Sequence, residues 1–188
     1  MTDIAIIGPQ GSGKTTLALN LVEHRNYVRI GIADAVKEIA NQFYPGIQKG
    51  NLFDTTRNGK FWLAQGRELY QDIGAAIRTV DEDAWLKLWL RKYEGAKMMG
   101  RSVVVDDLRL VREVDFLRAL NRNFKIVQLN ADAAKRNWRV RGGVIRPKDI
   151  TEQEWNKVSF DLSLDTTHLD ANQTFVRLHE WMTGEEEA

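Results

Sequence analysis

The chain of 188 residues contains no cysteine and only three prolines. Without a thiol it can form neither a disulfide nor a thiolate zinc site, and it cannot use a cysteine nucleophile. No apolar run approaches the roughly 18 residues that cross a membrane, and no signal peptide is recognisable. Neither sign of charge dominates, because 27 basic and 26 acidic side chains leave a net charge of +1. We therefore expect a soluble, cytoplasmic, globular protein without a membrane or nucleic-acid partner.

The chain does contain a complete Gly-x-x-x-x-Gly-Lys-Thr motif at residues 8–15. The motif follows the apolar run 4–7 and precedes the helix-prone segment 16–22, which is the strand–loop–helix setting in which it binds phosphate. Glycines let backbone N–H groups surround phosphate oxygens, and the start of a helix adds the positive end of its dipole. A chance Gly-rich turn is the alternative. The motif predicts binding of ATP with Mg²⁺.

Each residue type in this motif has a distinct predicted role. Lys14 is expected to reach the β- and γ-phosphates and to act in catalysis, and the hydroxyl of Thr15 is expected to ligate Mg²⁺. The residues expected to contact the nucleotide are Gly8, Gly11, Ser12, Gly13, Lys14, Thr15 and Thr16.

Short apolar runs alternate with longer amphipathic segments, which predicts an α/β fold of three layers, with a parallel central sheet flanked by helices, in one domain of residues 1–188. Trp85 and Trp89, four residues apart, are expected to pack in the core. Strands are expected at 4–7, 28–32, 102–105, 124–129 and 158–164. Helices are expected at 16–22, 35–40 with Asp34 as N-cap, 61–78, 82–94 with Asp81 as cap, 111–121, 131–140, after Thr151 and at 168–182, with an exposed loop at 48–60.

Two aspartates follow the apolar strand 102–105, at the edge where open α/β sheets bind their ligands. A carboxylate there can hold the Mg²⁺ shell or orient an attacking oxygen. We expect Asp106 to serve substrate and Mg²⁺, and Asp107 and Arg109 to act in catalysis. Strand-end solubility is the alternative for the aspartates.

A basic helix end, with Arg136, Arg139 and Arg141, runs into a glycine-containing loop. Several guanidiniums on such a segment are typical of a lid that closes over phosphates and neutralises their charge. We expect a lid at residues 136–155, with Arg136 on ATP and with Arg139 and Arg141 acting in transfer. A solvated helix face is the alternative.

Three segments carry a family resemblance, namely 31–40, 66–74 followed by Arg78, and 105–110 followed by Glu113. They are similar to segments of bacteriophage deoxynucleoside monophosphate kinases, which belong to the P-loop nucleoside monophosphate kinases, and they occur in the same order over most of residues 3–120. Two features depart from that family. Leu110 stands where an aromatic residue is expected, and the lid lacks a His-Pro-Ser-Glu-like segment.

The resemblance implies transfer of the γ-phosphoryl group of ATP to a (deoxy)nucleoside monophosphate. It also implies a monophosphate-binding helical segment at 32–80, in which Arg67 and Arg78 grip the acceptor phosphate. A helix-surface role is the alternative for both arginines, and an N-cap role is the alternative for Asp34. The residues implied to line the pocket are Asp34, Lys37, Arg67, Gln71 and Arg78.

Other functions remain open at this point. A P-loop kinase for another small acceptor, such as dephospho-coenzyme A, would share the sheet and the loop. An ATPase module of a DNA-processing assembly would share the loop, although the near-zero net charge argues against DNA binding. A nucleotide sensor without catalysis is a third alternative. A homodimer is neither predicted nor excluded.

Overall fold

The computed structural model describes residues 2–48, 52–57, 60–140 and 157–184, with the backbone alone over 52–57 and 60–64. The chain divides into two compact units, Met1–Gly31 with Tyr93–Ala188, and Ile32–Lys92. The first unit holds β1 (Ile4–Ile7), α1 (Lys14–His24), β2 (Tyr27–Arg29), β5 (Ser102–Val105), α5 (Val111–Leu120), β6 (Lys125–Asn130), α6 (Ala133–Arg139), β7 (Leu162–Asp165) and α7 (Ala171–Thr183). The second holds α2 (Asp34–Phe43), β3 (Leu52–Arg57), β4 (Lys60–Gln65) and α3 (Gly66–Val80), and α4 (Ala84–Met98) begins in the second unit and ends in the first.

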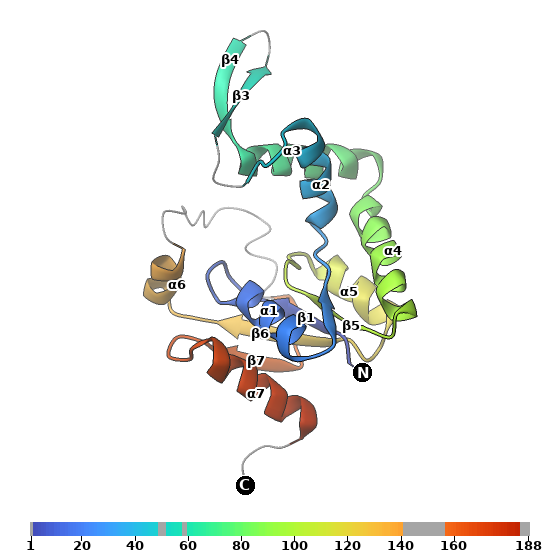
Figure 1. Cartoon of the computed structure of the whole chain (residues 1–188), viewed down its shortest axis with the longest axis vertical. Helices are drawn as coiled ribbons and strands as arrows, with labels where there is room; N and C mark the ends of the chain where they lie inside the picture. Colours follow the sequence, from blue (N-terminus) through green and yellow to red (C-terminus); the bar gives the residue numbers. More distant parts are fainter. Residues whose placement is uncertain (1, 49–51, 58–59, 141–156, 185–188) are drawn as a thin grey trace. The chain divides into compact units, whose positions relative to one another are not determined.

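A five-stranded sheet forms the centre of the first unit (Figure 1), and its strand order is β2-β5-β1-β6-β7. Every pairing is parallel, with Ile4 opposite both Val104 of β5 and Lys125 of β6. Strand β1 therefore lies in the middle, and its carboxyl end lies between those of β5 and β6. The predicted three-layer α/β fold with a parallel sheet is confirmed.

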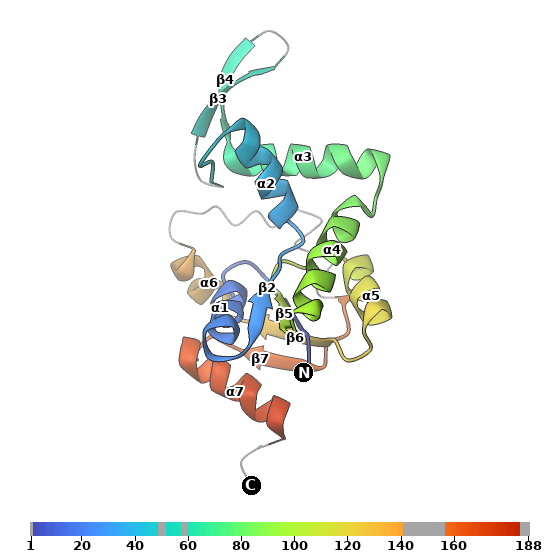
Figure 2. The ribbon, with the colours of Figure 1, turned by 45° about the vertical axis from the view of Figure 1, so that its right-hand side comes forward.

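Both faces of this sheet are covered, which explains why its central strands are continuous apolar runs. On one face Ile6, Val104 and Val127 pack with Leu17 of α1 and Leu178 of α7. The alternate residues of the same strands are also fully buried, so a second layer must cover the opposite face. Figure 2 shows α5 on the side of the sheet away from α1 and α7.

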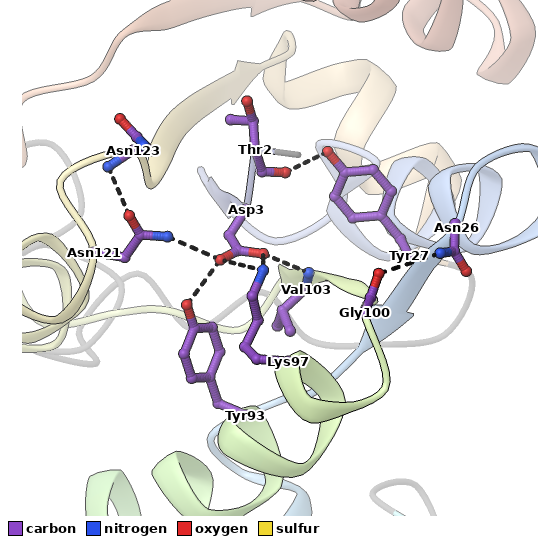
Figure 3. A network of polar contacts seen from close by, with 10 residues as sticks. All are labelled: Thr2, Asp3, Asn26, Tyr27, Tyr93, Lys97, Gly100, Val103, Asn121 and Asn123. Atoms are coloured by element: carbon purple, nitrogen blue, oxygen red, sulfur yellow. Dashed lines mark hydrogen bonds and ion pairs between the residues drawn. The ribbon is translucent and has the colours of Figure 1, made fainter.

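The amino end of β1 carries a fully buried carboxylate, Asp3, at the centre of a polar network (Figure 3). Asp3 accepts hydrogen bonds from the Tyr93 hydroxyl at 2.8 Å, from Lys97 Nζ at 2.9 Å and from the backbone N–H of Val103 at 2.8 Å. The side-chain amide of Asn121 donates at 3.1 Å. One carboxylate thus joins β1, the end of α4, β5 and the end of α5, and its charge is compensated by Lys97.

The second unit contains an antiparallel hairpin of β3 and β4, in a register from Leu52 opposite Gln65 to Arg57 opposite Lys60. The predicted loop at 48–60 is therefore wrong, and the helix predicted at 61–78 begins only at Gly66. The threonines and aromatics in these two runs favour β-strands. The dipeptide Asn58-Gly59, a strong hairpin signal, also separates the two runs.

Other helix boundaries differ from the prediction in detail. Asp34 is the first helical residue of α2 and the N-cap is Ala33, so the predicted N-cap role of Asp34 is wrong. Asp81 ends α3, and its carboxylate accepts the N–H of Asp83 just before α4. The helix predicted after Thr151 lies outside the described residues. Among those that are described, no helix is long and apolar enough to cross a membrane.

Candidate active site

The loop between β1 and α1 depends on three glycines with positive φ. The φ angles are +139° at Gly8, +82° at Gly11 and +100° at Gly13, in the region that side chains with a Cβ rarely adopt. A Cβ at Gly8 would also lie 2.1 Å from the Leu129 carbonyl oxygen, and one at Gly11 would lie 2.9 Å from that of Arg136. Glycine is thus required at both positions for space as well as for conformation.

This loop leads directly into α1, whose first residue is Lys14 and whose N-cap is Gly13. The first turn of α1 carries no acidic side chain, so the positive end of the helix dipole is not neutralised there. Lys14 Nζ donates to the carbonyl oxygens of Gly8 at 2.7 Å and Pro9 at 2.8 Å, which holds the ammonium against the loop. Thr15 and Thr16 are exposed at the helix start. The loop, the ammonium and the two hydroxyls fit a nucleotide polyphosphate with its Mg²⁺.

The two aspartates at the end of β5 have different surroundings. The Asp106 carboxylate is 1% exposed and lies 2.7 Å from Nη2 of Arg29, which ends the neighbouring strand β2. Asp107 is half-buried. Since a buried carboxylate needs a compensating charge, Arg29 accounts for Asp106. Asp107 is the more accessible carboxylate for a ligand.

Arg109 and Glu113 lie just beyond these aspartates. Glu113 is buried, and its Oε2 accepts the backbone N–H groups of Arg109 at 2.8 Å and Leu110 at 3.1 Å. These bonds satisfy donors at the start of α5. Glu113 therefore fixes the backbone that carries Arg109, whose side chain is half-buried.

The predicted lid arginines are described only in part. Arg136 of α6 donates from Nε to the carbonyl of Ala131, which precedes that helix, at 3.0 Å. The Arg139 guanidinium donates to the carbonyl oxygens of Gly11 at 3.3 Å and Thr166 at 2.7 Å. Arg141 and the rest of the lid predicted up to residue 155 lie outside the described residues. The described arginines of this group contact the body of the first unit.

The residues implied to bind the acceptor all lie in the second unit. Asp34 and Lys37 form an ion pair of 2.6 Å on the first turn of α2. Arg67, Gln71 and Arg78 lie at positions i, i+4 and i+11 of α3, which places them on one face of that helix. Within the described part of the chain, neither Arg67 nor Arg78 makes a side-chain hydrogen bond or ion pair.

Gly74, on the same face of α3, packs within the second unit. Gly74 lies between Gln71 and Arg78 and is buried, and a Cβ there would come within 3.7 Å of Arg78 Nη1. The Gly74 carbonyl accepts the indole N–H of Trp85 at 3.0 Å. Trp85 and Trp89 are each 2% exposed, so their predicted core role is confirmed.

Two residues at the carboxyl edge of the sheet are not predicted from the sequence, Arg29 and Thr166. Arg29 lies in a short strand and belongs to no motif, and its pairing with Asp106 depends on the order of β2 and β5. Thr166 follows β7, and its hydroxyl lies 2.8 Å from the Ser12 carbonyl oxygen. No local signal in the sequence links Arg29 to Asp106 or Thr166 to the loop. In the described ranges no group of three His, Asp or Glu side chains could hold a metal ion.

Comparison with known proteins places this geometry in a known fold. No protein-family model and no curated protein matches the chain. Among solved structures, a sugar kinase from Janibacter sp. HTCC2649 matches with a TM-score of 0.54 and 19% identity, over 97% of this chain and 95% of that one. A shikimate kinase from Aquifex aeolicus matches with a TM-score of 0.50 and 12% identity, over 97% of each chain. The chain therefore has the fold of P-loop kinases.

Proposed function

We propose that this protein is a kinase that transfers the γ-phosphoryl group of ATP to a (deoxy)nucleoside monophosphate and forms the diphosphate. The observation that carries the proposal is the loop of residues 8–15, in which three positive-φ glycines precede a helix whose first residue is Lys14. The carboxylates at the end of the adjacent strand β5 add groups that phosphoryl transfer needs.

On the donor side the chain itself supplies binding and orientation. The N–H groups of the loop and of the first turn of α1 bind phosphate oxygens, and Lys14 places a positive charge beside them. Thr15, with Asp106 or Asp107 acting through water, is the set that would hold Mg²⁺, which when bound neutralises charge on the β- and γ-phosphates. Asp107, as the more accessible carboxylate, orients the acceptor oxygen, and Arg109 adds positive charge at the same edge of the sheet.

On the acceptor side the proposal rests on α3 and on the family resemblance. A monophosphate carries up to two negative charges, and a guanidinium matches its oxygens with two parallel hydrogen bonds. Arg67 and Arg78 share one face of α3 and make no described side-chain hydrogen bond, so both can serve an acceptor. Gln71 between them offers an amide, and the Asp34–Lys37 pair on α2 adds groups for sugar or base.

A second candidate is a kinase for a small hydroxylated acceptor without a nucleoside. It is favoured by the similarity over nearly the whole chain to structures described as a sugar kinase and a shikimate kinase. The donor side would be unchanged. The two candidates differ in whether the face of α3 with Arg67 and Arg78 recognises a nucleoside phosphate or another anion.

The direct test is formation of ADP from ATP·Mg²⁺ with a panel of ribo- and deoxynucleoside monophosphates, with the diphosphate products identified. We expect turnover with at least one monophosphate and none without acceptor beyond slow hydrolysis. Parallel reactions with shikimate, gluconate and dephospho-coenzyme A test the other acceptors. ATP binding without turnover on any monophosphate would contradict the proposal, and hydrolysis stimulated by DNA would favour an ATPase module.

A further inference from the structure

The rear of the P-loop is held by two side chains that come from a later part of the chain. The hydroxyl of Thr166, 2% exposed, lies 2.8 Å from the Ser12 carbonyl oxygen. Arg139 Nη1 donates to the Gly11 carbonyl at 3.3 Å. Two successive carbonyl groups of the loop are therefore bound from the side of α6 and the β7–α7 connection.

Arg139 also fixes Thr166 itself. Its Nη1 donates to the Thr166 hydroxyl oxygen at 3.0 Å, and its Nη2 donates to the Thr166 carbonyl at 2.7 Å and to that of Leu169 at 3.4 Å. A hydroxyl has one proton to donate. Because Arg139 donates to the hydroxyl oxygen, that proton is left for a carbonyl, either Ser12 or Asn130, whose oxygen is 3.0 Å away.

The orientation of the Ser12 carbonyl determines where the next N–H group points. Since the peptide unit is planar and trans, the Gly13 N–H points away from the Ser12 C=O. A Ser12 carbonyl bound at the rear by Thr166 turns the Gly13 N–H toward the opposite side of the loop, where α1 begins. That N–H belongs to the group of donors that a phosphate at the helix start requires.

The backbone of α6 supports the same arrangement. A Cβ on Gly11 would lie 2.9 Å from both the Arg136 carbonyl oxygen and Cγ2 of Val140. The end of α6 therefore lies directly against the loop, and Arg139 extends from this end. All four described hydrogen bonds of the Arg139 guanidinium go to the loop and to the β7–α7 connection.

We propose that Thr166 and Arg139 are positioning residues for nucleotide binding, which hold the Ser12–Gly13 peptide so that its N–H faces the phosphates of the nucleotide. Arg139 acts through Thr166 and the loop carbonyls, and does not itself contact the transferred group. The inference rests on the proposed binding of ATP at the P-loop, and it is independent of the identity of the acceptor.

The test is calorimetric titration of ATP·Mg²⁺ and of inorganic tripolyphosphate into wild type, Thr166→Val and Thr166→Ser. Valine removes the hydroxyl at equal size, so we expect it to weaken both ligands by about tenfold, the effect of one hydrogen bond. Serine keeps the hydroxyl and should restore the affinity. Arg139→Lys keeps the charge but loses the two-nitrogen donor geometry of the guanidinium. Its effect on affinity should not add to that of Thr166→Val, because both residues act on the same peptide group.

Thr174→Val is the matched control. Thr174 is 6% exposed, and its hydroxyl donates at 2.7 Å to the carbonyl of Asp170, the N-cap of its own helix α7, rather than to the loop. We expect a similar loss of thermal stability from both valine variants and a loss of affinity only from Thr166→Val. If Thr166→Val does not fold, Thr166→Ser and Arg139→Lys provide the comparison in the same titration.

Two outcomes would overturn the inference. Wild-type affinity in Thr166→Val would show that the loop needs no support from the hydroxyl. A lower kcat in Arg139→Lys at unchanged affinity would assign the guanidinium to the transferred phosphoryl group instead. Absence of transfer from a wild-type protein that binds ATP would contradict the proposed function alone, whereas absence of ATP binding would contradict both.

Discussion

The two ends of strand β1 differ in whether their charged groups are compensated by partners within the protein. At the amino end the buried carboxylate of Asp3 is surrounded by donors of its own unit, among them Lys97 and the N–H of Val103 (Figure 3). At the carboxyl end the strand passes into a glycine loop and a helix start whose first turn carries no acidic side chain. A saturated charge stabilises the fold, whereas oriented donors that are not neutralised bind a charged ligand. We therefore assign a structural role to the amino end and propose a functional role for the carboxyl end.

The largest effect is expected from Gly8→Ala at the functional end. The added Cβ would lie 2.1 Å from the Leu129 carbonyl oxygen at a φ of +139°, so the loop must change its path and ATP binding should be lost. Gly95→Ala in α4 is the control, because its Cβ would meet nothing within 4 Å. Calorimetric titration with ATP measures both variants. Wild-type affinity in Gly8→Ala would contradict the described loop.

At the structural end, Asp3→Ala should lower the free energy of unfolding by about 3–5 kcal/mol, because it leaves Lys97 and several buried donors without their acceptor. Urea unfolding measures this loss. The exposed Asp115 offers the control, since Asp115→Asn should change the stability by about 0.5 kcal/mol or less. ATP affinity of the folded Asp3→Ala protein should equal that of wild type. A loss of ATP affinity in a folded Asp3→Ala protein would contradict the purely structural role of Asp3.

The parts of the fold that the sequence predicts correctly are those with a local signal. The strand, glycine loop and helix start around residues 4–16, the buried run of β5 and the parallel sheet follow from spacing and periodicity along a few residues at a time. The hairpin of β3 and β4 also has such a signal in Asn58-Gly59, but the polar character of the stretch around it predicts a loop. Asp34 was placed one position early, since capping and first-turn aspartates look alike in a sequence.

Other features depend on the order of strands and are invisible locally. Arg29 and Asp106 are far apart in the chain, and they meet because β2 and β5 are neighbours. Thr166 follows β7, and the parallel pairing of β7 with β6 brings it to the edge of the sheet where its hydroxyl contacts the P-loop. The sequence showed a basic helix end at Arg139, but the direction of that guanidinium depends on how α6 packs against Gly11.

The Arg29–Asp106 ion pair is a structural charge pair at the carboxyl edge of the sheet, where the proposed functional groups lie. Arg29→Met leaves a buried carboxylate unpaired and should cost about 2–3 kcal/mol of stability. The charge-matched double variant Arg29→Met/Asp106→Asn should recover most of this loss in urea unfolding. We expect the double variant to keep phosphoryl transfer within about tenfold of wild type.

Asp107→Asn is the companion variant for this pair. If Asp107 orients the acceptor oxygen, it should lose transfer by roughly a hundredfold or more while remaining as stable as wild type. The reverse pattern, with the double variant inactive and Asp107→Asn active, would assign the working carboxylate to Asp106. Initial rates at saturating ATP distinguish the two.

The smallest effect concerns the two tyrosines near Asp3. Burial raises the pKa of Tyr93 to about 12, with its hydrogen bond to Asp3 adding to the shift. Burial, followed by the charge of Asp3, raises the pKa of Tyr27 to about 12 as well. The unfolded chain releases these protons near pH 10 and the folded chain near pH 12. The free energy of unfolding should therefore decrease as the pH rises from about 10 to about 12. Urea unfolding at intervals across this range measures the fall, and Tyr93→Phe should make it shallower. An unchanged slope in that variant would contradict the described environment of Tyr93.

Phosphoryl transfer by wild type and Lys14→Ala, measured in parallel with circular dichroism, tests the functional end most directly. Lys14 lies at the start of α1 and holds its charge against the loop carbonyls of Gly8 and Pro9. Lys14→Ala should abolish transfer from ATP to the best nucleoside monophosphate and leave the spectrum and the melting temperature close to those of wild type. Near-normal turnover in Lys14→Ala would contradict the assignment of the P-loop as the phosphate site.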